Sequence, residues 1–332
     1  MKKLFACILA LGLLLSSGAA LASDDPVAIA IGVMNHPVHR IVELGFLKAA
    51  QELGYTDARV IGTEGADWAE VYAACNDFAA EGGKGIMLWA GDETAFPTLS
   101  RMKAEGVAVG IAHFKFVKED GTLPEGLTFN MACDPVLYGK QSAEIMAKAL
   151  DGKTGSVAIT LNTKNITENA ADESFRASWA ALGDTYNIAG IKLLDTQLEG
   201  GVVDEATAVN LAIIQANPDI IGAFGTTGNS PITWSDAAAK AGKADGEIAI
   251  IGMDATEGNL DALEAGKVLA LVAQPLYQEA YKTMEYLDKV LRGEEVPLWT
   301  DLEAPIVTKD GEGENGIAFH RGIAAQVETF FK

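Results

Sequence analysis

Basic residues are scarce in this chain, and their scarcity limits the partners it can have. Lysine and arginine number 25 against 46 aspartates and glutamates, which gives a formal net charge of −21 at pH 7. A surface this acidic repels nucleic acid and anionic membranes. We therefore expect no nucleic-acid partner and no polyanionic ligand.

Long apolar runs are also rare. The one long apolar stretch, 4–15, is too short to span a bilayer. It follows Lys2 and Lys3 and precedes a small-residue sequence ending at Ala22, the pattern of a cleaved signal peptide. We expect residues 1–22 to be removed. This leaves a mature chain of 310 residues with a net charge of −23 in the periplasm.

Cysteine is nearly absent from the expected mature chain. Cys7 leaves with the signal peptide, so only Cys75 and Cys133 remain. Cys75 falls on a predicted helix, 68–80, and Cys133 follows a predicted strand, 127–132. Two independent buried thiols are expected, and a bridge between them is the alternative because the periplasm permits disulfides.

Common signatures of catalysis are missing as well. The chain has no G-x-S-x-G elbow, no H-E-x-x-H motif and no phosphate-binding P-loop. His39 and Glu43 lie one helical turn apart and could act as an acid–base pair, although this spacing is more typical of surface pairs. We expect a protein that is not an enzyme and has no cofactor, with a secreted α/β enzyme as the alternative.

The chain does contain a repeated unit of buried strand, amphipathic helix and glycine stop. Such alternation predicts parallel sheets with right-handed crossovers. Strands are predicted at 27–34, 59–62, 85–90, 107–112, 127–132, 156–161, 191–196, 220–224, 247–252 and 268–273. The pattern restarts after 151–155, which favours an α/β fold of two similar doubly wound parallel-sheet lobes over one large sheet. A last long helix, 277–292, and a strand-like segment, 304–308, suggest that the chain returns to the first lobe and crosses back.

Polar and aromatic residues gather where the predicted strands end. Ligands of open parallel sheets bind beyond these carboxyl ends. Amides, imidazoles, hydroxyls, one carboxylate and aromatic rings suit a polyhydroxyl ligand, since they offer hydrogen bonds and a flat apolar face. The candidate ligand-binding residues are Asn35, His36, His39, Trp89, His113, Phe114, Asn169, Thr227, Asp254 and Gln274.

Several stretches resemble a known family. They are Ile31–Pro37, Cys133–Lys140, Ile251–Thr256, Leu269–Gln274 and Lys289–Glu294. With them the chain resembles periplasmic sugar-binding proteins of ABC importers, of the ribose/galactose-binding type (type I periplasmic binding proteins). The resemblance implies two lobes that close on a carbohydrate or polyol, a monomeric state, and delivery to ABC permease and ATPase subunits.

The resemblance also implies domain boundaries and a three-segment hinge. Crossings would fall near Cys133–Asp134, Gln274–Pro275 and Asp301–Leu302. After the signal peptide, 1–22, the N-terminal lobe would comprise 23–132 and 276–302. The C-terminal lobe would comprise 133–274 and 303–332.

Individual site residues follow the family pattern unevenly. Asp254 and Gln274 fit its sugar-binding carboxylate and amide, Thr227 stands where an Asn is usual, and Asn169 stands near a usual Arg. His39 and His113–Phe114 replace the family's aromatics and Asp-Arg pair, and Trp89 is a substitute stacking face. A polyol, a deoxysugar or an altered aldose therefore fits as well as a simple pentose or hexose.

Two further alternatives follow from the same residues. His36, His39 and His113 could together bind Zn²⁺, although no carboxylate lies at ligand spacing beside them, so we expect no metal. The protein could also present its ligand to a chemoreceptor or kinase, because a sensory binding protein would share the fold and the site.

Overall fold

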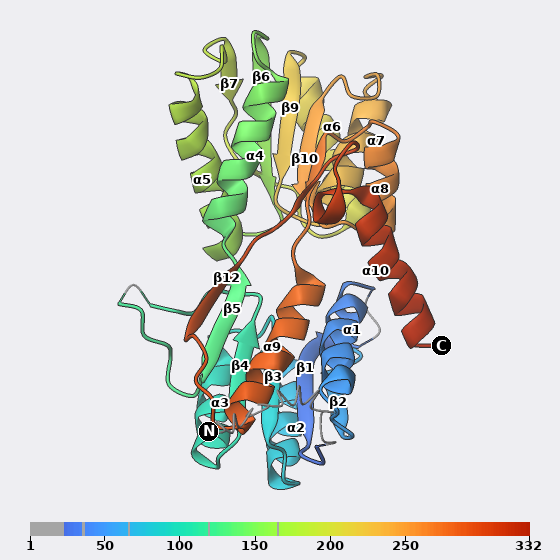
Figure 1. The fold of residues 1–332 in the computed structure, drawn as a ribbon. Coiled ribbons are helices and arrows are strands. Elements are labelled where there is room, and N and C mark those ends of the chain that lie inside the picture. The colour runs from blue at the N-terminus through green and yellow to red at the C-terminus, as the bar shows by residue number, and fades with distance from the viewer. Residues whose placement is uncertain (1–22, 35–36, 66, 119, 165) are drawn as a thin grey trace, which may run out of the picture.

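The computed structural model describes residues 23–34, 37–65, 67–118, 120–164 and 166–332. The expected signal peptide, 1–22, lies outside this part of the chain. Within it the strands form two separate sheets, of six and seven strands, rather than one large sheet. Figure 1 shows them in two lobes, one above the other. The predicted two-lobe α/β fold is therefore confirmed.

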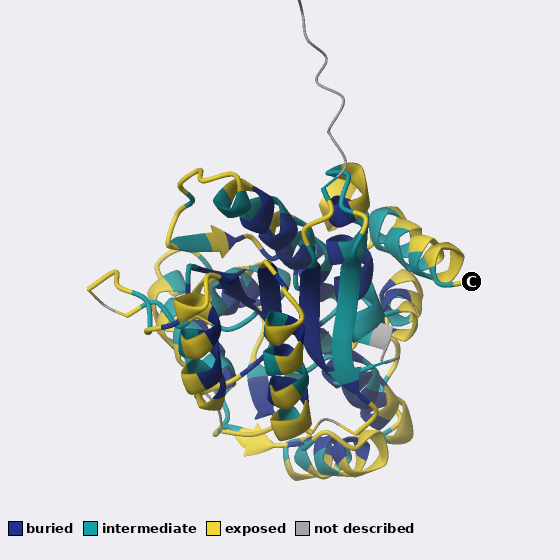
Figure 2. Cartoon of the chain, turned by 90° about the horizontal axis from the view of Figure 1, so that it is seen from below, coloured by how far each residue is buried: buried dark blue, intermediate teal, exposed yellow. Residues whose placement is uncertain are grey.

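The first sheet has the order β12-β5-β4-β3-β1-β2, and all of its strand pairs are parallel. Its inner strands, β1, β3, β4 and β5, are apolar and buried between helices (Figure 2), as parallel strands covered on both faces require. Its elements are β1 (Val27–Val33), α1 (Pro37–Glu52), β2 (Ala58–Thr63), α2 (Trp68–Ala80), β3 (Gly85–Trp89), α3 (Phe96–Ala104), β4 (Ala108–Ala112), β5 (Phe129–Cys133), α9 (Leu276–Leu291) and β12 (Trp299–Leu302).

The second sheet has the order β13-β11-β10-β9-β6-β7, with β8 paired to β6 and only β13 antiparallel to its neighbour. Its elements are α4 (Pro135–Ala149), β6 (Gly155–Leu161), α5 (Ile166–Leu182), β7 (Ile191–Leu193), β8 (Gln197–Leu198), α6 (Val203–Ala216), β9 (Ile220–Gly225), α7 (Ser230–Lys240), β10 (Ala249–Met253), α8 (Glu257–Glu264), β11 (Ala270–Val272), β13 (Ile306–Val307) and α10 (Ile317–Phe330).

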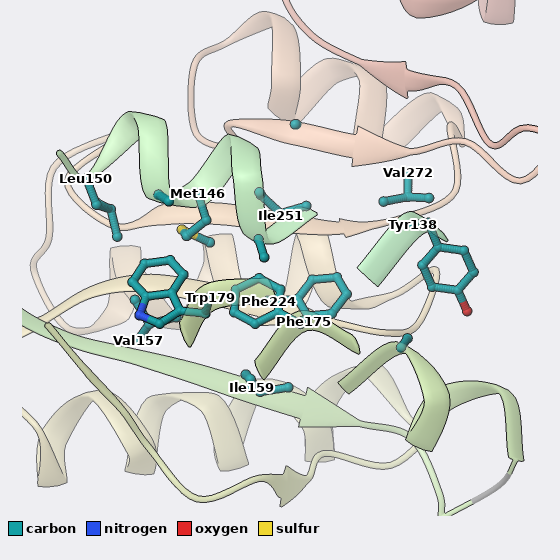
Figure 3. Packing of buried hydrophobic residues seen from close by; sticks show 14 of the residues in the cluster. Tyr138, Met146, Leu150, Val157, Ile159, Phe175, Trp179, Phe224, Ile251 and Val272 are labelled. Carbon is teal, nitrogen blue, oxygen red and sulfur yellow. The ribbon is translucent and has the colours of Figure 1, made fainter. Parts of the chain in front are cut away.

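Stacked aromatic rings fill one core of the second lobe. Phe175 on α5 lies parallel to Phe224 on β9, with ring centroids 4.9 Å apart, and to Trp179 at 5.8 Å (Figure 3). These rings join residues of α4, β6 and β10 in one buried cluster. Burial of such large apolar side chains is the main source of stability for the lobe.

Side-chain caps begin several helices where the sequence indicates them. Asp67 accepts hydrogen bonds from the backbone N–H of Ala69 and Glu70 at the start of α2. Asp134 and Thr256 cap α4 and α8 in the same way. Each cap satisfies backbone donors that lack a partner within the helix.

Three elements differ from the sequence-based expectation. Strand β12 lies where a connection is expected, β8 is an additional two-residue pairing, and the terminal helix α10 is not anticipated. The four residues of β12 include the exposed Asp301, and no side chain of α10 is fully buried. Neither segment therefore carries the strong apolar pattern on which the prediction depends. None of the helices in the described residues is long and apolar enough to cross a bilayer.

Both cysteines of the expected mature chain are free and buried. Cys75 belongs to a core cluster of the first sheet, whereas Cys133 packs in a cluster of the second lobe. Burial raises the pKa of the Cys75 thiol to about 12. The interpretation of two independent buried thiols is confirmed over a disulfide.

Candidate functional site

The carboxyl edges of the two sheets face each other. Strand β5 of the first sheet leads directly into α4 of the second lobe, and β11 of the second sheet leads through Gln274 into α9 of the first. The chain passes between the lobes once more after β12, to reach β13 (Figure 1). Loops after the parallel strands therefore converge on the junction between the lobes.

Backbone conformation singles out the same edges. Three non-glycine residues of the described chain have positive φ: Ala90 at 57°, His113 at 87° and Asp254 at 64°. They directly follow β3, β4 and β10. Such left-handed conformations cost energy outside glycine and cluster at ligand sites, so they support a functional role for these strand ends.

Asp254 is held firmly at the end of β10. Its backbone N–H donates to the carbonyl of Val272 at 2.8 Å, and its own carbonyl accepts from the buried amide of Asn259 at 2.9 Å. Asn259 also donates to Gly228, at 2.8 Å, and so ties the loop after β9 to the loop after β10. A Cβ placed on Gly228 would lie 2.4 Å from Oδ2 of Asp254, so glycine is needed for this close approach.

The environment of the Asp254 carboxyl is unusual for an acid. Burial raises its pKa to about 6, His113 acts against this shift, and Glu279 adds to it. Its Oδ1 atom is buried and has no hydrogen-bond partner among the described residues. A buried polar atom without a partner costs free energy, which a ligand donor at this position would recover.

Asp254 and Gln274 line one cavity at the junction of the lobes. The cavity has contributions from α1, from the loop after β10, from the segment between β11 and α9, and from α10. Its lining residues are Val38, Ile41, Asp254, Ala255, Thr256, Ala273, Gln274, Pro275, Leu276, Tyr277, Gln278, Pro305, His320 and Ile323. The two residues that best match the family pattern are thus brought together.

A contiguous group of rings lies at the strand ends of the first lobe. The Trp89 ring lies 4.5 Å from His113 and 4.9 Å from His39, and the His113 ring lies 4.9 Å from Phe114. His39 Nδ1 is 2.5 Å from the carbonyl oxygen of Val33. Four of the predicted site residues, from three elements or loops, therefore meet in one aromatic cluster.

Other predicted site residues have different surroundings. The Thr227 hydroxyl contacts Ser230 at 3.0 Å and Glu199 at 3.4 Å, so it stabilises the loop after β9. Asn169 lies in the first turn of α5, beside Glu168, whose carboxylate accepts from Thr226 at 2.7 Å. Asn35 and His36 lie outside the described residues.

The alternative sites proposed from the sequence gain no support. Glu43 pairs with Arg40 at 2.6 Å, and burial raises its pKa. No group of three His, Cys, Asp or Glu in the described residues is arranged to hold a metal ion. Because His36 is outside that part of the chain, metal analysis of the dialysed protein is the test of the three-histidine hypothesis.

Sequence reasoning missed Glu279. It lies in the first turn of α9 and is fully buried; its Oε2 accepts from the Trp89 indole at 3.0 Å and lies 3.3 Å from His113 Nδ1. The sequence feature that could have revealed Glu279 is an acidic residue on the apolar face of a predicted helix, three residues after Leu276 and four before Thr283. A charged residue at such a position is seldom buried without a specific partner.

Helix α10, which the sequence did not predict, forms another side of the cavity. Arg321 pairs with Asp261 at 2.7 Å and Glu264 at 2.9 Å on α8, while Gln326 accepts from Lys48 on α1 at 2.9 Å. The helix therefore contacts both lobes, and Figure 1 shows it descending from the upper lobe alongside α1. Its residues His320 and Ile323 line the cavity.

A cavity between two parallel-sheet lobes joined by three crossings defines a two-lobe binding protein with the type I periplasmic architecture. The sequence profile described as periplasmic binding protein domain matches residues 27–295, most of the chain. This chain belongs to that family.

Named relatives agree with this assignment. The ribose import binding protein of Salmonella typhimurium strain LT2 is 26% identical over 316 residues, covering 93% of this chain and 99% of that protein. Its counterpart from Escherichia coli K12 is 25% identical over the same coverage. Among solved structures, a periplasmic ribose ABC transporter protein from Conexibacter woesei has a TM-score of 0.78, with 18% identity over 92% of this chain and 97% of that one.

A second solved structure shares the fold and contains bound D-allose. The periplasmic solute-binding protein of Actinobacillus succinogenes with bound D-allose has a TM-score of 0.76 and 18% identity, over 90% of this chain and 99% of that one. At this level of identity the likeness concerns the fold and does not transfer a ligand.

Proposed function

We propose that this protein is the periplasmic solute-binding component of an ABC importer, capturing a sugar or sugar-like polyol between its lobes and delivering it to a membrane permease. It acts as a monomer after removal of residues 1–22. The observation that carries the proposal is the cavity at the lobe junction, where Asp254 and Gln274 lie together with residues from the other lobe. Carboxylate and amide groups are suited to hydrogen-bonding adjacent hydroxyl groups.

The proposed closure requires a hinge, and the three chain crossings provide its location. We assign 23–132 and 276–302 to the N-terminal lobe, and 133–274 and 303–332 to the C-terminal lobe. Strand β5 ends at Cys133 and α4 begins at Pro135, which supports a first crossing near Cys133–Asp134. Short connections that absorb backbone rotation are the usual site of such closure.

A ligand panel tests the function directly. Thermal unfolding is measured with D-ribose, D-allose, D-galactose, D-glucose, myo-inositol and sorbitol, and with D-glucosamine, D-galactosamine and D-mannosamine. At 100 times its dissociation constant a true ligand adds about 2.7 kcal/mol to the free energy of unfolding. The ligand should be recovered chemically unchanged. Conversion to a product would overturn the binding function, and the absence of any shift would overturn the assignment to sugars and polyols.

Replacing Gln274 with alanine tests the amide contact. Gln274 lines the cavity between β11 and α9, so Gln274→Ala removes one neutral hydrogen-bonding group from the proposed site. Affinity should fall by about 0.5–1.5 kcal/mol, roughly 2- to 10-fold in the dissociation constant. Gln197→Ala, at an exposed position on β8, is the matched control and should bind normally. Equal affinities for the two variants in calorimetry would remove Gln274 from the site.

A further inference from the structure

Two carboxylates at the lobe junction each have one buried oxygen without a hydrogen-bond donor among the described residues. These atoms are Asp254 Oδ1 and Glu279 Oε1. Buried carboxylates normally accept hydrogen bonds on both oxygens, because leaving one unpaired costs free energy. Glu199 shows the usual arrangement in this protein, since its two oxygens accept from Ser230 and from Asn210.

The two carboxylates lie on different lobes, and the charge of Glu279 acts on Asp254. The backbone N–H of Asp254 is bonded to Val272, the last residue of β11, and Glu279 follows seven residues later in the first turn of α9. His113 links them further, since it contacts Glu279 and its charge acts on Asp254. Gln274, between the two, lines the cavity with Asp254.

No lysine or arginine in the described chain forms an ion pair with either group. Among the described residues, Glu279 pairs only with His113, at 3.3 Å, and Asp254 forms no salt bridge. Two negative charges close together in a desolvated setting repel each other. Apart from His113, no cationic side chain of the described residues pairs with these carboxylates, so a cationic group of the ligand would offset their negative charge.

Aromatic rings lie beside the carboxylates. The Trp89 indole donates to Glu279 at 3.0 Å, which fixes the plane of its ring, and it is only 4% exposed. The His113 ring packs against it and retains 16% side-chain exposure. Aromatic faces next to carboxylates attract compact organic cations through both charge and ring quadrupole.

We propose that the ligand carries a protonated amino group, as an amino sugar or an amino polyol, and that this ammonium is held by Asp254 and Glu279 against the Trp89–His113 rings. An ammonium donates up to three hydrogen bonds and so supplies donors for both unpaired oxygens. The hydroxyl groups of the same ligand contact the neutral groups of the cavity. This inference rests on the proposed function and specifies its ligand class.

The decisive experiment compares matched pairs that differ in one substituent. Isothermal titration calorimetry at pH 7 measures D-glucose against D-glucosamine, D-galactose against D-galactosamine, and D-mannose against D-mannosamine, with the N-acetylated forms as uncharged controls. At least one amine should bind roughly tenfold or more tightly than its hydroxyl parent, since charge-assisted bonds are about twice as strong as neutral ones. N-acetylation should abolish the gain.

The outcomes separate the inference from the function on which it rests. Neutral parents that bind as tightly as the amines would overturn the ammonium site and leave sugar capture intact. Failure of every neutral and aminated compound to bind would count against the proposed function itself and, with it, the inference.

Variants test the two carboxylates separately. Glu279→Gln keeps an oxygen that accepts from the Trp89 indole but removes the charge, so the amine preference should fall by about tenfold. Glu285→Gln, on the same helix, makes the same charge change away from the site and should preserve the preference. If Glu279→Gln does not fold, Asp254→Asn provides the same comparison at the other carboxylate. An undiminished preference in either folded variant overturns its carboxylate's role.

Discussion

Replacing Asp254 with asparagine is expected to weaken ligand binding by roughly 10- to 150-fold and to stabilise the ligand-free protein at neutral pH. The loss of affinity follows because the amide replaces one accepting oxygen with a donor and removes the charge from the hydrogen bonds. Asparagine tolerates the φ of 64° at this position, so the backbone of the loop after β10 is preserved. Calorimetric titration with the best ligand of the panel measures the effect.

The gain in stability follows from the pKa of Asp254. Burial, with a contribution from Glu279, raises it to about 6 from the ordinary 3.8. The folded protein therefore binds this proton more tightly than the unfolded chain does, so the free energy of unfolding falls as pH rises through the window from about 4 to about 6. At pH 7 the asparagine variant should be more stable than the unaltered protein by about 3 kcal/mol, and near pH 4 most of the difference should vanish.

Asp236→Asn is the matched control for this prediction. Asp236 is exposed on α7, so the same substitution there should change neither the affinity nor the pH dependence of unfolding. Denaturant unfolding of the three proteins between pH 4 and pH 8 provides the comparison. A variant at position 254 that is less stable at pH 7, or that binds ligand normally, would show that the Asp254 carboxyl is not a strained ligand contact.

Leu287→Ala should have the largest effect on stability and almost none on binding. Leu287 is 0% exposed in the core between α9 and the first sheet, and it lies beside Gly85 at the start of β3. Truncating a buried leucine costs about 2–5 kcal/mol of unfolding free energy, because the surrounding core relaxes only partly. Affinity should stay near normal, since Trp89 lies at the opposite end of β3, about 13 Å further along the strand.

Leu298→Ala controls for the loss of the same side chain at an exposed position. Leu298 is 53% exposed, so its truncation should change the free energy of unfolding by less than about 0.5 kcal/mol. Chemical denaturation and calorimetric titration of both variants separate stability from binding. A Leu287→Ala protein of normal stability, or one with a large loss of affinity, would contradict the separation between the core and the site.

The predicted strand ends were informative because parallel strands place all their carboxyl ends at the same edge of a sheet. Once a segment is recognised as a strand of a parallel sheet, its carboxyl end lies at the edge where ligands of such sheets bind. Asp254 and Gln274 were placed correctly at this edge, and the structure brings them into one cavity. The ring cluster of His39, Trp89 and His113 follows from the same argument.

Short or weakly patterned segments escaped the prediction for physical reasons. Strand β12 is held by its pairing with β5, more than 160 residues earlier in the chain, and not by its own apolar pattern. Helix α10 is held by the ion pair that its Arg321 forms with Asp261 on α8 and by contacts with α1. None of its side chains is fully buried. Tertiary contacts stabilise such elements without leaving a strong local signal.

The order of residues determined the two-lobe fold, the family and the strand ends, because hydrophobic periodicity and glycine stops act within a few residues of the chain. Only the tertiary structure decided that Glu279 meets Trp89 across 190 positions, and that Asp254 is a buried carboxyl with an unpaired oxygen. Hydrogen bonding and desolvation between distant segments depend on how the lobes pack against each other. No local pattern encodes that packing.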